Sequence, residues 1–156
     1  MVLQPTSLHR DGMQVSPIIA GTWKWGAWGH RLSISDQADL IQHCFELGIT
    51  TFDLADIYGD HTTEEEFGAA LQQRGIPRGQ LQLVTKCGIK MPSPRRPYAQ
   101  KSYDTSAAHI TWSVDQSLRA LQTDYLDLLL IHRPSPLMDP VEISETFTRL
   151  REQGKV

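Results

Sequence analysis

The sequence lacks most features that mark secreted, metal-binding or nucleic-acid-binding proteins. Its 156 residues include two cysteines, Cys44 and Cys87. They form no CxxC or other ligand spacing, which argues against a disulfide framework or a zinc site and favours a reducing compartment. The formal net charge is -3, so electrostatics give no reason to expect nucleic acid or an anionic membrane as a partner.

Long apolar runs are also missing. The N-terminal stretch MVLQPTSLHRDG contains no apolar signal-peptide core, and an aliphatic run such as LDLLLI at 126–131 is far too short to cross a bilayer. We therefore expect a cytoplasmic protein that does not bind membranes. An apolar share of 40% with 21% charged residues is typical of a globular chain, and we treat residues 1–156 as one domain.

Strand-like and helix-like segments alternate after a predicted hairpin. Asp11-Gly12 between two short extended pieces predicts that hairpin. Short apolar strands are then predicted at 17–21, 49–53, 81–86 and 126–132, and segments with helical periodicity at 35–48, 62–75, 105–122 and 141–154. Ser35 is the predicted cap of the first helix, Thr63 and Glu66 have capping-box spacing, and Asp139 precedes a proline suited to a first helical turn.

Four strand–helix units in succession predict a parallel α/β fold with right-handed connections. An open nucleotide-binding sheet calls for a glycine-rich GxGxxG turn after its first strand. Here GTWKWGAWGH at 21–30 follows that strand and does not match the pattern. The sequence therefore favours a TIM (β/α)₈-type barrel, of which the hairpin and the first four βα units are present.

Ionisable residues stand at the ends of three successive predicted strands. Asp53 ends the second strand, Lys86 the third and His132 the fourth, while Tyr58 follows Asp53 in the next loop. Each alone has an ordinary explanation: a capping aspartate, a solvated lysine, a turn histidine or a tyrosine covering a helix end. Because barrel enzymes build their active sites at the carboxyl ends of the strands, the four together predict a catalytic site.

These residue types suit the reduction of a carbonyl group. A tyrosine is a poor proton donor near neutral pH unless a nearby ammonium stabilises its phenolate, and a carboxylate can hold that ammonium in place. Tyr58 is thus the predicted general acid, supported by Lys86 and Asp53. A neutral His132 is expected to donate a second hydrogen bond to the carbonyl oxygen. Since no side chain delivers hydride, a nicotinamide cofactor is implied.

Three segments carry a family resemblance over essentially the whole chain. GITTFDLADIYGDHTTEEEFG at 48–68 resembles the signature of the aldo-keto reductase superfamily, and the match continues through TKCGI at 85–89 and YLDLLLIHRP at 125–134. The resemblance implies a (β/α)₈ barrel that binds NADPH and reduces a small-molecule aldehyde or ketone. It also implies a catalytic tetrad: Asp53, Tyr58, Lys86 and His132.

The resemblance assigns further residues to the cofactor and the substrate. Gly21, Thr22 and Asp53 match positions that contact the cofactor near its nicotinamide end. Trp23 matches a residue that lines the substrate pocket, and two neighbouring tryptophans are expected to extend its wall: Trp25 and Trp28. The proline- and arginine-rich segment from 88 to 104 departs from any pattern that would specify the substrate.

A complete barrel of this type needs about 250 residues, so we expect the domain to be truncated before the fifth strand and the activity of this chain to be in doubt. Its exposed strand edges then favour self-association. One alternative is a non-catalytic module of the same family that binds no cofactor. Another is a different barrel enzyme, with Lys86 as a Schiff-base nucleophile or with Asp53, His61 and His132 as metal ligands.

Overall fold

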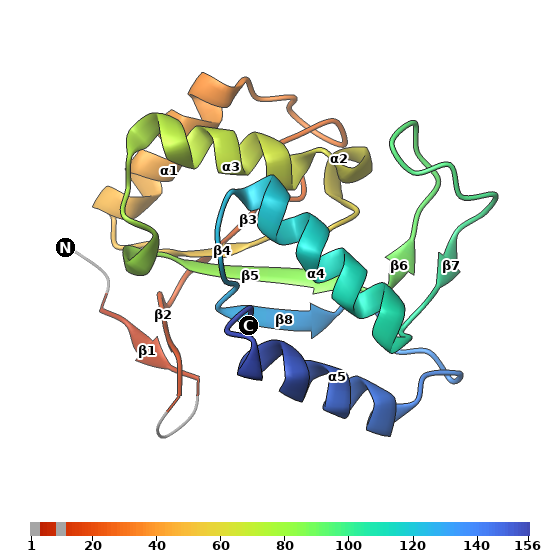
Figure 1. The fold of residues 1–156 in the computed structure, drawn as a ribbon. Helices are drawn as coiled ribbons and strands as arrows, with labels where there is room; N and C mark the ends of the chain where they lie inside the picture. The colour runs from red at the N-terminus through yellow and green to blue at the C-terminus, as the bar shows by residue number, and fades with distance from the viewer. Residues whose placement is uncertain (1–3, 9–11) are drawn as a thin grey trace.

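A four-stranded parallel sheet organises the computed structural model, which describes residues 4–8 and 12–156. The strands lie side by side in chain order, and every neighbouring pair is parallel (Figure 1). They are β3 (Ile19–Gly21), β4 (Thr51–Asp53), β5 (Gln82–Cys87) and β8 (Leu128–Ile131). All four predicted strands are confirmed, with shorter bounds at most ends.

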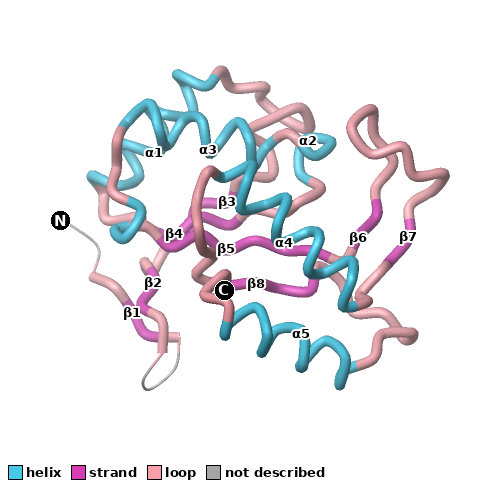
Figure 2. Tube along the Cα trace, viewed as in Figure 1, coloured by secondary structure: helices cyan, strands magenta, loops and turns pink. Residues whose placement is uncertain are grey.

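Each strand is followed by a long helix. The helices are α1 (Ile34–Glu46), α3 (Thr63–Arg74), α4 (Ala107–Leu121) and α5 (Pro140–Glu152). They pack against one another in chain order and cover the same face of the sheet, as Figures 1 and 2 show. The predicted succession of strand–helix units is therefore confirmed.

The alternation of side chains along the strands creates two unlike faces. Phe52, Leu83 and Leu129 point toward the helices and are 0%, 0% and 4% exposed. With residues such as Ile41 and Phe67 they form the main hydrophobic core. Asp53 and Lys86 project from the opposite face, because each follows a core position in strands whose side chains alternate.

Helix starts differ in part from the predicted caps. In α1 the cap is Ser33, which forms a capping box with Asp36, so the helix begins before the predicted Ser35. The predicted Thr63–Glu66 box does not form, because the residue at the cap of α3 is Thr62, whose hydroxyl donates to Gly59 O instead. Asp139 caps α5 as predicted, accepting from two backbone amides.

Two small antiparallel ribbons lie at opposite ends of the sheet (Figure 1). The N-terminal ribbon pairs β1 (Thr6–Ser7) with β2 (Gln14–Val15), as predicted, although the Asp11 of its turn lies outside the described residues. The second pairs β6 (Ile89–Lys90) with β7 (Ser102–Tyr103) inside a segment that was expected to be a loop. No helix in the described ranges is long and apolar enough to cross a membrane.

Candidate active site

Three neighbouring strands deliver the predicted rim residues to one end of the sheet. Asp53 is the last residue of β4, Lys86 the next-to-last of β5, and His132 follows β8 directly. Backbone hydrogen bonds continue past the end of β4, since the Leu54 amide donates to Val84 O. The end of β4 is thus fixed against β5, and Asp53 and Lys86 meet on the face that the helices leave uncovered.

A tight turn after β4 brings Tyr58 to the same place. Tyr58 begins the short α2 (Tyr58–His61), where Gly59 has a φ of 59°. A Cβ at Gly59 would lie 2.5 Å from the Thr63 hydroxyl oxygen, so both the backbone angle and the space require glycine. The Tyr-Gly pair therefore belongs to the turn that aims the tyrosine ring back over the strand ends.

Lys86 is the centre of the cluster. Its Nζ lies 2.8 Å from each carboxylate oxygen of Asp53, 2.6 Å from Leu54 O and 3.0 Å from the Tyr58 hydroxyl oxygen. An ammonium has three hydrogens, and these three partners account for all of them. The Tyr58 oxygen therefore accepts from Lys86, and its own hydrogen remains available for another acceptor.

His132 closes the site from the β8 side. Its ring meets the Tyr58 ring edge-on, with centroids 5.8 Å apart at 81°. Burial lowers the pKa of His132 to about 4, and the positive charges of Lys86 and Arg133 add to the effect. The imidazole is therefore neutral near pH 7. Its Nδ1 is buried without a hydrogen-bond partner.

Tyr58 and His132 form part of a shallow pocket of about 310 Å³. Apolar side chains supply most of the wall: Trp23, Trp28, Ile57, Ile89 and Met91. Lys101 and Arg133 complete the lining. An apolar pocket with a free phenolic hydrogen at its base is suited to an organic molecule that presents an oxygen acceptor.

The three predicted pocket tryptophans separate in the structure. Trp23 is half exposed and Trp28 donates from Nε1 to Asp60 at 2.8 Å, and both line the pocket. Trp25 does not, which corrects the expectation from its sequence position. It is 8% exposed and packs in the core against Phe52 and Phe67, with ring centroids 6.3 and 6.0 Å away.

The residues expected to meet a nicotinamide lie beside Asp53. Gly21 pairs with Asp53 in the sheet register, and a Cβ built on it meets no atom within 4 Å. Thr22 is fully buried, and both its amide and its hydroxyl donate to Asp53 O at 3.0 Å. Gly21 thus borders open space next to the lysine–tyrosine cluster, as a planar ring approaching the strand ends would require, while Thr22 fixes the Asp53 backbone. The assignment of these residues to a cofactor stays a prediction.

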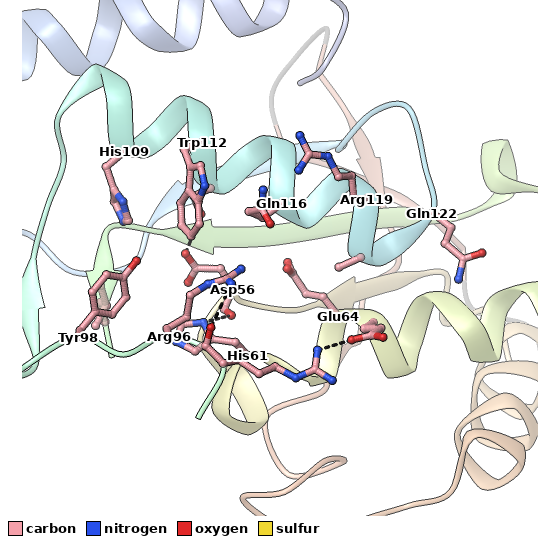
Figure 3. A pocket seen from close by; sticks show the side chains of 15 residues that line it. Asp56, His61, Glu64, Arg96, Tyr98, His109, Trp112, Gln116, Arg119 and Gln122 are labelled. Carbon is pink, nitrogen blue, oxygen red and sulfur yellow. Dashed lines mark hydrogen bonds and ion pairs between the residues drawn. The ribbon is translucent and has the colours of Figure 1, made fainter. Parts of the chain in front are cut away.

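Sequence reasoning missed a second group of acids on the helix side of the same loop. Asp56 and Glu64 line a cavity of about 540 Å³ beneath α4. Figure 3 shows the two carboxyl groups on one side of this cavity and side chains of α4, among them Trp112, on the other. No local pattern in the sequence marks this group, because its members come from the loop after β4, from α3 and from α4.

These two acids are held by hydroxyl groups. Ser113 donates to one oxygen of Asp56 at 2.7 Å, and Thr85 donates to Glu64 at 2.6 Å. The other Asp56 oxygen is buried and has no partner. Burial, together with the charge of Glu64, raises the pKa of Asp56 to about 8, and burial also raises the pKa of Glu64. Asp56 therefore holds a proton at neutral pH.

The alternative sites find little support in the geometry. His61 lies between two carbonyl oxygens, with Nδ1 at 2.8 Å from Asp56 O and Nε2 at 3.0 Å from Met91 O, so both its nitrogens are engaged away from His132. In the part of the chain that the structure describes, no three His, Cys, Asp or Glu side chains group as metal ligands. Lys86 is bound to the Asp53 carboxylate, a state that does not suit a nucleophilic amine.

Known proteins resemble this chain over nearly its whole length. The family model described as "Aldo/keto reductase family" matches residues 17–156. The chain is 48% identical over 155 residues to the oxidoreductase YcsN of Bacillus subtilis, covering 99% of this chain and 51% of YcsN. It is 44% identical over 147 residues to a 6-dehydroglucose reductase of Agrobacterium fabrum, covering 94% of this chain and 49% of that protein.

A solved structure gives the same result. The holo form of the aldo-keto reductase AKR11C1 from Bacillus halodurans superimposes with a TM-score of 0.81 at 30% identity, over 97% of this chain and 47% of that one. This similarity confirms the predicted fold class, an α/β chain that forms part of a TIM-type barrel. The chain spans about half the length of the curated relatives it matches.

Proposed function

The chain belongs to the aldo/keto reductase family, and from that membership we propose that it carries the proton-donating site of an NADPH-dependent aldehyde or ketone reductase. One observation carries the proposal. Lys86 uses its three hydrogens on Asp53, Leu54 and Tyr58, which leaves the Tyr58 hydrogen free in a pocket that also contains the neutral His132.

Tyr58 is the proton donor in this proposal. A substrate carbonyl accepts the Tyr58 hydrogen, and the proton moves to the oxygen as that oxygen becomes an alkoxide. The hydrogen bond from Lys86 then stabilises the phenolate that remains. Asp53 contacts Nζ with both oxygens, so it holds the ammonium in position. Each residue thus acts on the charge that develops during proton transfer.

His132 orients the substrate. A neutral imidazole carries one N–H, and Nδ1 is the buried nitrogen without a partner. We therefore place the hydrogen on Nε2, where it donates to the same carbonyl oxygen as Tyr58. Two donors on one oxygen fix the plane of the carbonyl and favour the developing negative charge.

Gly21, Thr22 and Asp53 are the residues of this chain that we propose to border the nicotinamide. When bound, a reduced nicotinamide supplies the hydride that no side chain can provide. The open space at Gly21 and the fixed backbone of Asp53 fit such a group. The naming of one relative as a 6-dehydroglucose reductase agrees with a carbonyl substrate.

The test is consumption of NADPH in the presence of 4-nitrobenzaldehyde. We expect the purified protein to oxidise NADPH at a rate that depends on the aldehyde, and Tyr58→Phe to lower this rate by about 100-fold or more. Tyr103→Phe is the matched control, because Tyr103 is half exposed on β7 and outside the site. Equal rates for Tyr58→Phe and the unmodified protein would refute the proposal.

A further inference from the structure

Two cations border the pocket above Tyr58 and His132. Lys101 immediately precedes β7 on the second ribbon, and Arg133 follows His132 after β8. They reach the pocket lining from separate elements of the fold. Among the residues that the structure describes, no aspartate or glutamate lines this pocket, and the charged groups in that lining are positive.

Neither cation is neutralised by the part of the chain that the structure describes. Two other basic side chains near this end of the sheet have an acidic partner: Lys86 contacts Asp53, and Lys90 contacts Asp104. Lys101 and Arg133 have no carboxylate within 4.0 Å, and none of their side-chain nitrogens donates a hydrogen bond to a described residue. Their charges therefore remain available to a ligand.

Both charges act on the catalytic end of the pocket. Burial is the main reason for the low pKa of His132, but Arg133 and Lys101 also lower it, while the Asp53 carboxylate opposes them. The two cations are thus close enough to influence a group in contact with Tyr58. A ligand whose carbonyl lies between Tyr58 and His132 would extend toward them along the apolar wall of Trp23 and Trp28.

We propose that the substrates of this site are carbonyl compounds that also carry an anionic group, such as a carboxylate, which Arg133 and Lys101 bind. This inference rests on the proposed reductase function and adds a substrate class to it. Arg133 suits the role because a guanidinium presents parallel N–H donors to a carboxylate, and Lys101 adds a mobile point charge. Both act as specificity residues, since they bind a part of the substrate that does not react.

An anionic group could also come from the cofactor, whose phosphates are negatively charged. The two sources make different predictions. If Arg133 and Lys101 bind a substrate carboxylate, removing either cation lowers kcat/KM more for an anionic aldehyde than for a neutral one. If they bind a cofactor phosphate, removing either cation raises the KM for NADPH with every aldehyde.

The experiment compares two matched aldehydes, 4-formylbenzoate and its neutral methyl ester, with NADPH as the reductant. We expect the protein to have a higher kcat/KM for 4-formylbenzoate. Arg133→Gln should lower kcat/KM for the acid by roughly three- to tenfold and Lys101→Gln by about threefold, as is typical of partly exposed charge contacts. The loss for the ester should be smaller than the loss for the acid, and the KM for NADPH should change by less than about twofold.

Arg151→Gln is the matched control. Arg151 lies in the last turn of α5, and this end of the helix leads to Lys155, whose backbone oxygen accepts from the amide of Leu126 just before β8. Arg151 is thus at the opposite end of the strands from Arg133. Arg151→Gln makes the same change of charge outside the pocket. The ratio of kcat/KM for the acid to kcat/KM for the ester should therefore be unaffected.

Three results would overturn the substrate class: equal losses for acid and ester, no loss for either, or an increase confined to the KM for NADPH. If neither aldehyde is reduced, that result counts against the proposed function alone. A separate binding measurement then tests the proposed anion site. In that measurement 4-formylbenzoate is titrated without cofactor, and the fluorescence of Trp23 and Trp28 reports binding. Saturable quenching that weakens in Arg133→Gln supports the anion site, and identical titrations for acid and ester refute it.

Discussion

Asp53 and Asp56 stand three residues apart in one segment, yet the structure gives them opposite surroundings. Asp53 contacts the Lys86 ammonium with both oxygens at 2.8 Å on the open face of the sheet. Asp56 turns to the helix side, where Ser113 donates to one oxygen and the other is buried without a partner. One acid pairs with an ammonium, whereas burial raises the pKa of the other to about 8.

The difference shows that the role of an acid here depends on the side of the sheet it faces. On the open side a lysine from the next strand reaches the carboxylate. On the helix side the neighbours are hydroxyl groups and a second acid, Glu64, which favour a protonated carboxyl. The same segment therefore supplies a charged group for the proposed chemistry and a neutral group for the packing beneath α4.

The largest effect on activity is expected from removing Lys86, which contacts both Asp53 and Tyr58. Lys86→Met removes the donor to Tyr58 and leaves the Asp53 carboxylate without its cation. We expect aldehyde-dependent NADPH consumption to fall by about 100-fold or more, while circular dichroism still shows a folded protein. Lys90→Met is the control for the loss of a lysine at the same end of the sheet. Comparable rates in the two variants would contradict the role of Lys86.

The next effect compares the two acids directly. Asp53→Asn removes the charge that positions Lys86, and we expect kcat to fall by about tenfold or more. Asp56→Asn replaces a carboxyl that is already protonated at neutral pH, so kcat should change by less than about twofold. Steady-state kinetics at pH 7 measure both. A larger loss of kcat in Asp56→Asn than in Asp53→Asn would contradict the assignment of the catalytic role to Asp53.

A smaller effect concerns stability and pH. Because folding raises the pKa of Asp56 from about 4 to about 8, the folded protein holds a proton that the unfolded chain releases between these values. The free energy of unfolding should therefore fall as pH rises from 4 to 8. Asp56→Asn removes this contribution.

Urea denaturation at pH 5 and pH 8 checks the prediction. The stability of Asp56→Asn relative to the unmodified protein should increase between the two pH values, by at most about 1.4 kcal/mol per pH unit. Asp124→Asn, at an exposed acid, is the control. A relative stability that is constant or falls with pH would show that Asp56 is ionised in the folded protein.

The smallest effect is a change in the titration of His132. Its pKa of about 4 is set mainly by burial, so Arg133→Gln should raise that pKa only slightly and Arg151→Gln not at all. NMR titration of the His132 ring measures both. In either protein the imidazole should stay neutral from pH 6 to 8. A pKa near 6.5 in the unmodified protein would remove the basis for a neutral histidine beside Tyr58.

The cluster of Asp53, Lys86 and His132 could be predicted from the sequence. The surroundings of Asp56 on the helix side of the sheet could not. Asp53, Lys86 and His132 each follow an apolar run whose end is visible in the sequence, and parallel strands bring such ends together. The partner of Asp56 is Ser113, 57 residues later on a helix, and no local pattern joins them. Their contact depends on how α4 lies across the sheet.

Turns were the other source of error. Trp23, Trp25 and Trp28 fall within six residues, and periodicity cannot assign their directions because the segment is neither helix nor strand. Backbone hydrogen bonds within it, such as Leu32 N–H to Trp25 O, turn Trp25 inward. The ribbon of β6 and β7 was missed for a related reason: prolines separate its two short strands, and only their pairing makes them regular.

The contacts of Lys86 also show how little of the chain is needed to form the centre of the site. Its three partners, Asp53, Leu54 and Tyr58, lie within the unit formed by β4, α3 and β5, and the longest separation among them is 33 residues. One strand–helix–strand module is therefore enough to assemble the ammonium, its counter-ion and the phenol. Only His132 must arrive from the following unit. The proton-donating cluster is therefore local in the sequence, and the following unit adds to it the group that orients the substrate.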